Sequence, residues 1–189
     1  MKNVIKRALL GIKAKRTMIS EPEVVERGET RCVGYRIATS MKDNRKSRDI
    51  PPFFHEVYDG RKLEGFRKDG RRKVFCIFGT MNGEGDFDYY VAEEGGIGEA
   101  AEGTEGISLA SGSYVRIEVL KKSHGAVAGV LGYVMNVWLR KNGYAGRNAP
   151  CFIIYDERFH RNYEKFGCVD GKYPGKPVSV LLIPVRKAA

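Results

Sequence analysis

The chain has 189 residues, of which 42% are hydrophobic and 11% aromatic. This length supports one sizeable core and is short for two ordinary domains, and this composition excludes a disordered chain. The formal net charge is +10, but residues 1–16 carry bases and no acid, whereas residues 84–105 carry eight acids and neither Lys nor Arg. Such a bipolar chain differs from a uniform polyanion binder, and this argues against nucleic acid as the main ligand.

Residues 1–22 are predicted to form a basic helical extension, which packs on the body of the protein or touches a partner protein. No apolar stretch long enough for a secretory signal follows its bases, and the sequence contains no membrane-spanning segment. We therefore expect a soluble, cytoplasmic protein with no membrane partner. The apolar residues of the extension lie on one helical stripe: Val4, Ile5, Ala8, Leu9 and Ile12.

The segment that follows is predicted to form three strands and one helix. Alternating apolar and polar residues favour strands, and Pro51 and Pro52 suit the first turn of a helix, whose N–H groups have no partner inside the helix. Residues 20–29 are interpreted as an approach segment, and residues 95–106, rich in glycine and glutamate, as a mobile acidic linker. The expected elements are a strand at Thr30–Thr39, a helix at Pro52–Gly65, and strands at Lys73–Phe78 and Phe87–Glu94.

The chain after the linker shows a similar order of patterns. An alternating strand precedes a helix with apolar residues at helical spacing, and two strongly apolar strands follow. The expected elements are a strand at Tyr114–Leu120, a helix at Ala126–Asn142, and strands at Pro150–Tyr155 and Val178–Val185. This repeated order predicts an α+β fold, in which duplicated βαββ units form one antiparallel-rich sheet with helices on one face.

Five segments occur in an order and spacing typical of one known family. They are Gly85–Glu94, Ala110–Ile117, Val137–Tyr144, Pro150–Tyr155 and Leu182–Val185. Together they resemble the GyrI-like, AraC-type effector-binding domain, and the resemblance assigns residues 23–189 to one such domain. It implies a pocket for a small molecule between the two halves. The family includes sensor domains of multidrug-responsive regulators, stand-alone ligand-sequestering proteins, gyrase-inhibitory proteins and hydrolases of strained cyclopropane-bearing toxins.

The sequence departs from the family pattern at two positions of the implied pocket. Where the family commonly has a glutamate that meets a cationic ligand, this chain has Ile153, and where an aromatic often precedes Ile-Pro-Val, it has Leu182. A buried carboxylate is what allows an apolar pocket to select lipophilic cations. Glu93 or Glu118 could replace it, although each also fits a solvated strand residue.

Four aromatic residues are the other candidates for contact with a ligand. Tyr89, Tyr90 and Tyr155 lie on predicted strands and could stack on a flat molecule, and Trp138 lies on the apolar stripe of the second helix. All four also fit ordinary core positions.

The sequence carries no motif for a metal or for nucleophilic catalysis. The four cysteines have no Cys-x-x-Cys spacing and are interpreted as small buried hydrophobic residues, and the three histidines lie far apart in the chain. Ser111 and Ser113 lack the Gly-x-Ser-x-Gly elbow of serine hydrolases. We therefore expect no cofactor, no metal and no catalytic residue.

The sequence favours a stand-alone module that binds a small hydrophobic or aromatic ligand and senses or sequesters lipophilic compounds. Two alternatives remain open. One is a hydrolase of strained toxic electrophiles, although the sequence favours a protein that is not an enzyme. The other is a gyrase-inhibitor-like protein that meets a protein partner through its charged surface.

Overall fold

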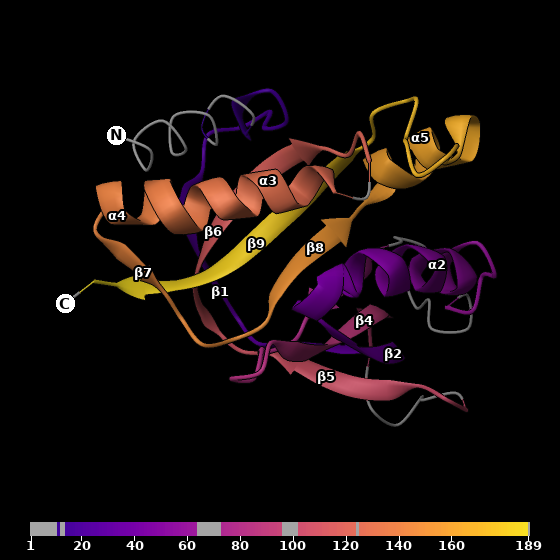
Figure 1. The fold of residues 1–189 in the computed structure, drawn as a ribbon, viewed down its shortest axis with the longest axis horizontal. Coiled ribbons are helices and arrows are strands. Elements are labelled where there is room, and N and C mark those ends of the chain that lie inside the picture. Colours follow the sequence, from indigo (N-terminus) through magenta and orange to yellow (C-terminus); the bar gives the residue numbers. More distant parts are fainter. Residues whose placement is uncertain (1–10, 12–13, 64–72, 96–101, 124, 189) are drawn as a thin grey trace. The chain divides into compact units, whose positions relative to one another are not determined.

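The computed structural model describes residues 11, 14–63, 73–95, 102–123 and 125–188, which fall into two compact units. Unit 1 comprises residues 1–27, 112–148 and 158–189, and unit 2 comprises residues 28–111 and 149–157. The secondary structure of both is drawn in Figure 1. Each unit therefore gathers segments that are distant in sequence.

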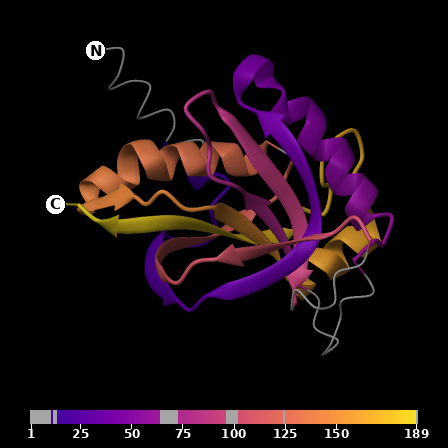
Figure 2. The same cartoon turned by 90° about the horizontal axis from the view of Figure 1, so that it is seen from below.

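Unit 2 is an antiparallel sheet with one principal helix. Its strands follow the spatial order β8-β3-β4-β2-β5, and helix α2 lies beside β2 and β4 (Figure 2). The elements are β2 (Thr30–Ser40), η1 (Lys42–Asn44), α2 (Lys46–Tyr58), β3 (Val74–Phe78), β4 (Asp86–Glu94), β5 (Glu105–Leu109) and β8 (Cys151–Tyr155).

Unit 1 contains the antiparallel strands β1, β6 and β9 in that order, with β7 paired to β9. Its long helix is continuous through a π-helical segment, η4. The elements are β1 (Glu23–Arg27), β6 (Gly112–Leu120), α3 (Ala126–Tyr133), η4 (Val134–Trp138), α4 (Leu139–Lys141), β7 (Tyr144–Gly146), α5 (Glu157–Phe166) and β9 (Val178–Lys187).

The α+β class and the antiparallel pairing agree with the sequence prediction, and the predicted strands occur within two residues of their expected ends. The repeat is not divided between the units as the linear order suggested, because β8 pairs with β3 in unit 2. Both strands are almost continuously apolar, and their pairing covers one edge of each. Strands β1, β5 and β7 and helix α5 were not predicted.

Helix α2 begins six residues before the expected Pro52 and ends at Tyr58 rather than Gly65. The Asp49 carboxylate accepts hydrogen bonds from Thr39 Oγ1 at 2.8 Å and from Arg45 Nε at 2.9 Å. These contacts fix the first turn ahead of the two prolines, which then lie inside the helix.

Some predictions fall outside the described residues. They concern residues 1–10 and 12–13 of the N-terminal helix, Gly65 at the expected end of a helix, and residues 96–101 of the acidic linker. The end of that linker forms the start of β5. In the part of the chain that the structure describes, no helix is long and apolar enough to cross a membrane.

Candidate ligand-binding site

One face of the sheet in unit 2 is lined by aromatic residues. Side chains alternate along a strand, so Tyr89 and Glu93 of β4 point to the same face. In the observed register Tyr89 lies opposite Phe78 of β3, and Glu93 lies opposite Val74, which in turn lies opposite Tyr155 of β8. The face therefore extends across three neighbouring strands.

Helix α2 packs on this face through two consecutive aromatic residues. The Phe53 ring lies 6.2 Å from the Tyr89 ring, and the Phe54 ring lies 5.6 Å from the Tyr155 ring, both edge to face. Phe54 is also stacked on Tyr58, one turn later in the helix. Such ring pairs stabilise the packing beyond the area they bury. We call the surface formed by Phe53, Tyr89, Phe78, Glu93 and Tyr155 the helix-bearing face.

The helix-bearing face has a buried base and a more accessible rim. Tyr89 is 3% exposed, and Tyr155 and Phe54 are each 1% exposed. Phe53 and Phe78 are only half-buried, and Phe78 lies 5.1 Å from Tyr89 between ring centroids. The two half-buried rings therefore flank the buried tyrosine on this face.

Glu93 is a buried carboxylate on the same face, with 4% of its surface exposed. Its neighbours across the sheet are Val33 on β2 and Val74 on β3. Burial raises the free energy of a carboxylate and strengthens its attraction to a positive group.

The structure brings together four of the predicted site residues and separates a fifth. Tyr89, Glu93, Ile153 and Tyr155 all lie on the helix-bearing face. Tyr90 points to the opposite face, where its strand neighbour is Arg36 of β2. Partial burial, and then the negative charge of Asp88, raise the pKa of the Tyr90 hydroxyl.

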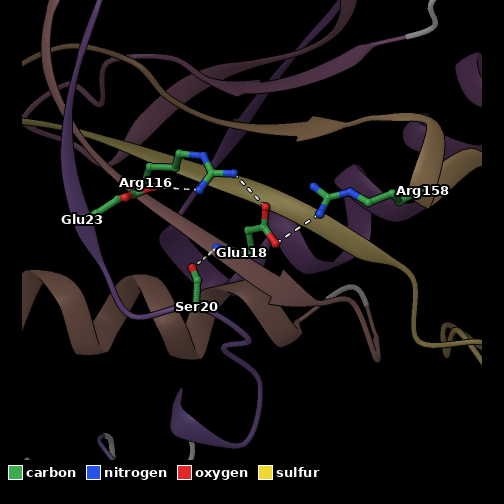
Figure 3. Close-up of polar contacts among 5 residues, drawn as sticks. All are labelled: Ser20, Glu23, Arg116, Glu118 and Arg158. Atoms are coloured by element: carbon green, nitrogen blue, oxygen red, sulfur yellow. Dashed lines mark hydrogen bonds and ion pairs between the residues drawn. The ribbon is translucent and has the colours of Figure 1, made fainter.

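Glu118 lies in unit 1, where two arginines form ion pairs with its carboxylate (Figure 3). Its carboxylate accepts hydrogen bonds from Arg116 Nη2 at 2.7 Å and from Arg158 Nη1 at 3.1 Å. Arg116 also donates to Glu23 Oε1 at 2.8 Å, and the Glu118 backbone N–H donates to Ser20 Oγ at 2.9 Å.

These contacts determine the charge state of Glu118. The guanidinium of Arg158, followed by that of Arg116, holds the pKa of the Glu118 carboxyl below its ordinary value. The carboxylate is therefore ionised at neutral pH, and its charge is balanced by two cations. Of the two acids that the sequence offered, it is Glu93 that lies on the helix-bearing face.

The last two predicted residues also lie in unit 1. Leu182 of β9 is fully buried and lies opposite Arg116 of β6. Trp138, at the end of η4, is half-buried, and its ring is stacked on Tyr144 with 6.2 Å between centroids and 18° between planes.

Sequence analysis missed several residues around both acids. Phe53 and Phe54 lie within the predicted helix Pro52–Gly65 but were not named as site residues, and their tertiary partners on β4 and β8 have no local signal. Arg116 could have been found, since it lies two residues before Glu118 on the same face of a strand. Arg158 is 40 residues away in sequence from Glu118 and could not.

Two of the four cysteines are buried as predicted, whereas Cys151 and Cys168 are only half-buried. Cys32 and Cys76 are buried in strands β2 and β3, and burial raises the pKa of the Cys151 thiol to about 11. Among the described residues, no group of three or more His, Cys, Asp or Glu side chains could hold a metal ion.

A family model matches most of the chain. The model described as Cass2, integron-associated effector binding protein, matches residues 23–170. No curated protein sequence matches the chain.

Three solved structures share the fold at low sequence identity. SAV2435 bound to tetraphenylphosphonium is 16% identical, with a TM-score of 0.65 over 88% of this chain and 94% of its own. A putative transcription regulation protein from Staphylococcus aureus MU50 is 18% identical, with a TM-score of 0.62 over 88% and 98%. An integron cassette protein from the mobile metagenome of Vibrio cholerae is 16% identical, with a TM-score of 0.62 over 90% and 99%.

Proposed function

Because the chain belongs to the Cass2 family of integron-associated effector binding proteins, we propose that it binds a small hydrophobic effector on the helix-bearing face of unit 2. This membership agrees with the resemblance to GyrI-like effector-binding domains. Binding of this kind would let the protein sense or sequester lipophilic compounds.

The observation that carries the proposal is the set of aromatic rings between α2 and its sheet. Phe53 and Phe78 are half-buried and both contact the buried Tyr89. Because Phe53 and Phe78 are only partly covered by the protein, each can take a further aromatic group in offset or edge-to-face geometry. A ligand would enter at Phe53 and Phe78, and these rings would have to move apart for it to rest on Tyr89, which is 3% exposed.

The buried Glu93 gives the proposed site a preference for cations. The family's usual glutamate is replaced by Ile153, but Ile153 and Glu93 belong to the same face of the sheet. A lipophilic cation brings positive charge without a strongly held hydration shell, so it loses little on entering apolar surroundings. SAV2435, which shares the fold, was solved with such a cation, tetraphenylphosphonium.

Two ions of similar size and opposite charge test the proposal. Tetraphenylphosphonium is expected to raise the melting temperature by several degrees at concentrations well above its dissociation constant, whereas tetraphenylborate has a much smaller effect. Isothermal titration of the same pair gives the affinities. The absence of binding by either ion, in the wild-type protein, would reject the proposed site.

The variant Glu93→Gln separates the role of charge from that of shape. It is expected to weaken tetraphenylphosphonium binding about tenfold, because it removes a buried carboxyl group that can supply negative charge to a bound cation, and to leave tetraphenylborate binding unchanged or improved. The matched control is Glu94→Gln, since Glu94 is the next residue of β4, is exposed and points to the opposite face. Equal effects of the two substitutions would remove Glu93 from the site.

A further inference from the structure

The charges of the chain are divided between the two units far more sharply than the linear sequence suggests. Unit 1 holds 20 of the 33 Lys and Arg residues and 6 of the 23 Asp and Glu residues, so its formal charge is +14. Unit 2 holds the other 13 bases and 17 acids, and its formal charge is −4. In the fold, the positive charge of the chain is therefore concentrated in unit 1.

Two long stretches of unit 1 contain no acid at all. They are residues 119–148 and residues 171–189. They meet where β7 pairs with β9, because Tyr144 lies opposite Lys187. The C-terminal end of α4, strand β7 and the end of β9 lie together there in both views (Figures 1 and 2).

This end of unit 1 combines cations with accessible aromatic rings. Lys141 follows Trp138 by three residues, so both lie on one side of the helix, and Lys187 shares a face with Tyr144 across the β7–β9 pair. Lys141 and Lys187 are exposed, while the stacked rings of Trp138 and Tyr144 are half-buried. We call these four residues the basic aromatic patch.

We propose that the basic aromatic patch binds single-stranded nucleic acid. A site for single-stranded nucleic acid needs positive charge and aromatic rings. Here the lysines would bind the phosphates, and the bases would stack on the rings beside them. Exposed Arg140 and Arg186 lie next to the patch in sequence and add to its positive field. Trp138 and Tyr144 are half-buried rather than enclosed, which leaves part of their surface for contact with a base.

The aromatic rings distinguish this partner from other anions. An acidic polymer or an anionic lipid surface would be attracted by the charge of unit 1 but would gain nothing from continuing a stack of rings. A base gains contact with a ring, an effect that is independent of sequence. Single strands are preferred to duplexes because their bases are free to stack.

Trp138 is the one tryptophan of the chain, so its fluorescence reports directly on the patch. A 12-residue oligothymidylate is expected to quench it saturably at low salt, and binding should weaken with salt at a slope of about −3 in log K against log salt, for about four phosphates. An abasic oligonucleotide of the same length and charge is expected to bind about tenfold more weakly and to quench little.

Matched lysine variants test where the oligonucleotide binds. Lys141→Gln with Lys187→Gln should weaken binding about tenfold and reduce the salt slope by about one. The control, Lys42→Gln with Lys73→Gln, removes the same charge from exposed positions of unit 2 and should change binding less than twofold.

Four results would overturn the proposal. Equal binding of the abasic strand would make unit 1 a general polyanion surface. Quenching by phosphatidylserine vesicles without any by oligonucleotides would make the patch a membrane contact. Equal effects of the two lysine pairs would reduce the interaction to net charge, and absence of binding at low salt would leave no nucleic-acid site.

Discussion

Glu118 and Glu93 are both glutamates on strands, yet their surroundings give them different chemistry. Glu118 is held by Arg116 and Arg158, whereas Glu93 is buried between valines of neighbouring strands. The first arrangement stabilises the fold, because it joins β6 to α5. We propose that the second serves ligand binding.

The ion pairs of Glu118 predict a pH-dependent contribution to stability. The pKa of its carboxyl is lowered in the folded protein, so its stabilising effect is complete above the ordinary pKa of about 4.5 and is lost as the pH falls through the lower folded value. Glu118→Gln should therefore reduce the free energy of unfolding by about 1 kcal/mol at pH 7, and the difference from wild type should shrink below pH 4.5.

Urea unfolding at several pH values measures this difference. Glu164→Gln is the control, because Glu164 is an exposed residue of α5 in the same unit. A loss of stability that stays constant from neutral to acid pH, or one that the control reproduces, would contradict the role given to the arginines.

The Cys151 thiol is predicted to be unreactive in the folded protein. Burial disfavours its thiolate and raises its pKa to about 11, and the thiolate is the reactive form. Alkylation by iodoacetamide at pH 8.5, followed by mass spectrometry of the peptides, should leave Cys151 unmodified in the native protein and modify it fully in urea. Rapid labelling of the native thiol at this pH would show that the site is open.

For single residues, the sequence predicted which side chains are candidates for the site better than it predicted which face of the sheet each one lies on. Glu93, Tyr89 and Tyr155 were candidates from strand patterns, and the structure places them on one face. The alternation of a strand shows that Tyr89 and Tyr90 oppose each other, but not which of the two faces carries the helix. That information comes from the contact of Phe53 with Tyr89, which is a tertiary property.

Among the secondary-structure elements, β2 and β4 approach unusually closely at Gly34. A Cβ atom at this position would lie 2.2 Å from the Val91 carbonyl oxygen and 2.4 Å from Ala92 Cα. Gly34→Ala must therefore push two central strands of unit 2 apart, and it should destabilise the protein by about 3 kcal/mol.

Chemical denaturation of two alanine variants checks this prediction. Gly28→Ala is the control, because nothing lies within 4 Å of a Cβ atom at that position, and it should change stability by less than about 0.5 kcal/mol. If both variants were equally stable, β2 and β4 would be less tightly constrained at Gly34 than the coordinates indicate.

The elements that the sequence predicted are those with long or strongly apolar patterns. Strands β1, β5 and β7 have three to five residues, and their short patterns are masked by neighbouring charged or glycine-rich segments. Helix α5 did carry a signal, since Phe159, Tyr163 and Phe166 follow helical spacing. Helix α5 could therefore have been predicted from the sequence, whereas the short strands could not.

For the whole molecule, the main feature hidden from the sequence is the interleaving of segments. Residues 149–157 leave the second half of the chain to complete the sheet of unit 2, and no local pattern encodes such a long-range pairing. The same interleaving concentrates positive charge in unit 1. The linear charge pattern argued against a nucleic-acid ligand, and the folded distribution reopens that possibility for one unit.

The position of tetraphenylphosphonium in a crystal structure of the complex tests the central claim most directly. We predict that the ion lies on the helix-bearing face of unit 2, with a phenyl ring against Tyr89 between Phe53 and Phe78 and its positive centre toward Glu93. An ion bound elsewhere, with the packing of α2 on Tyr89 and Tyr155 unchanged, would contradict it.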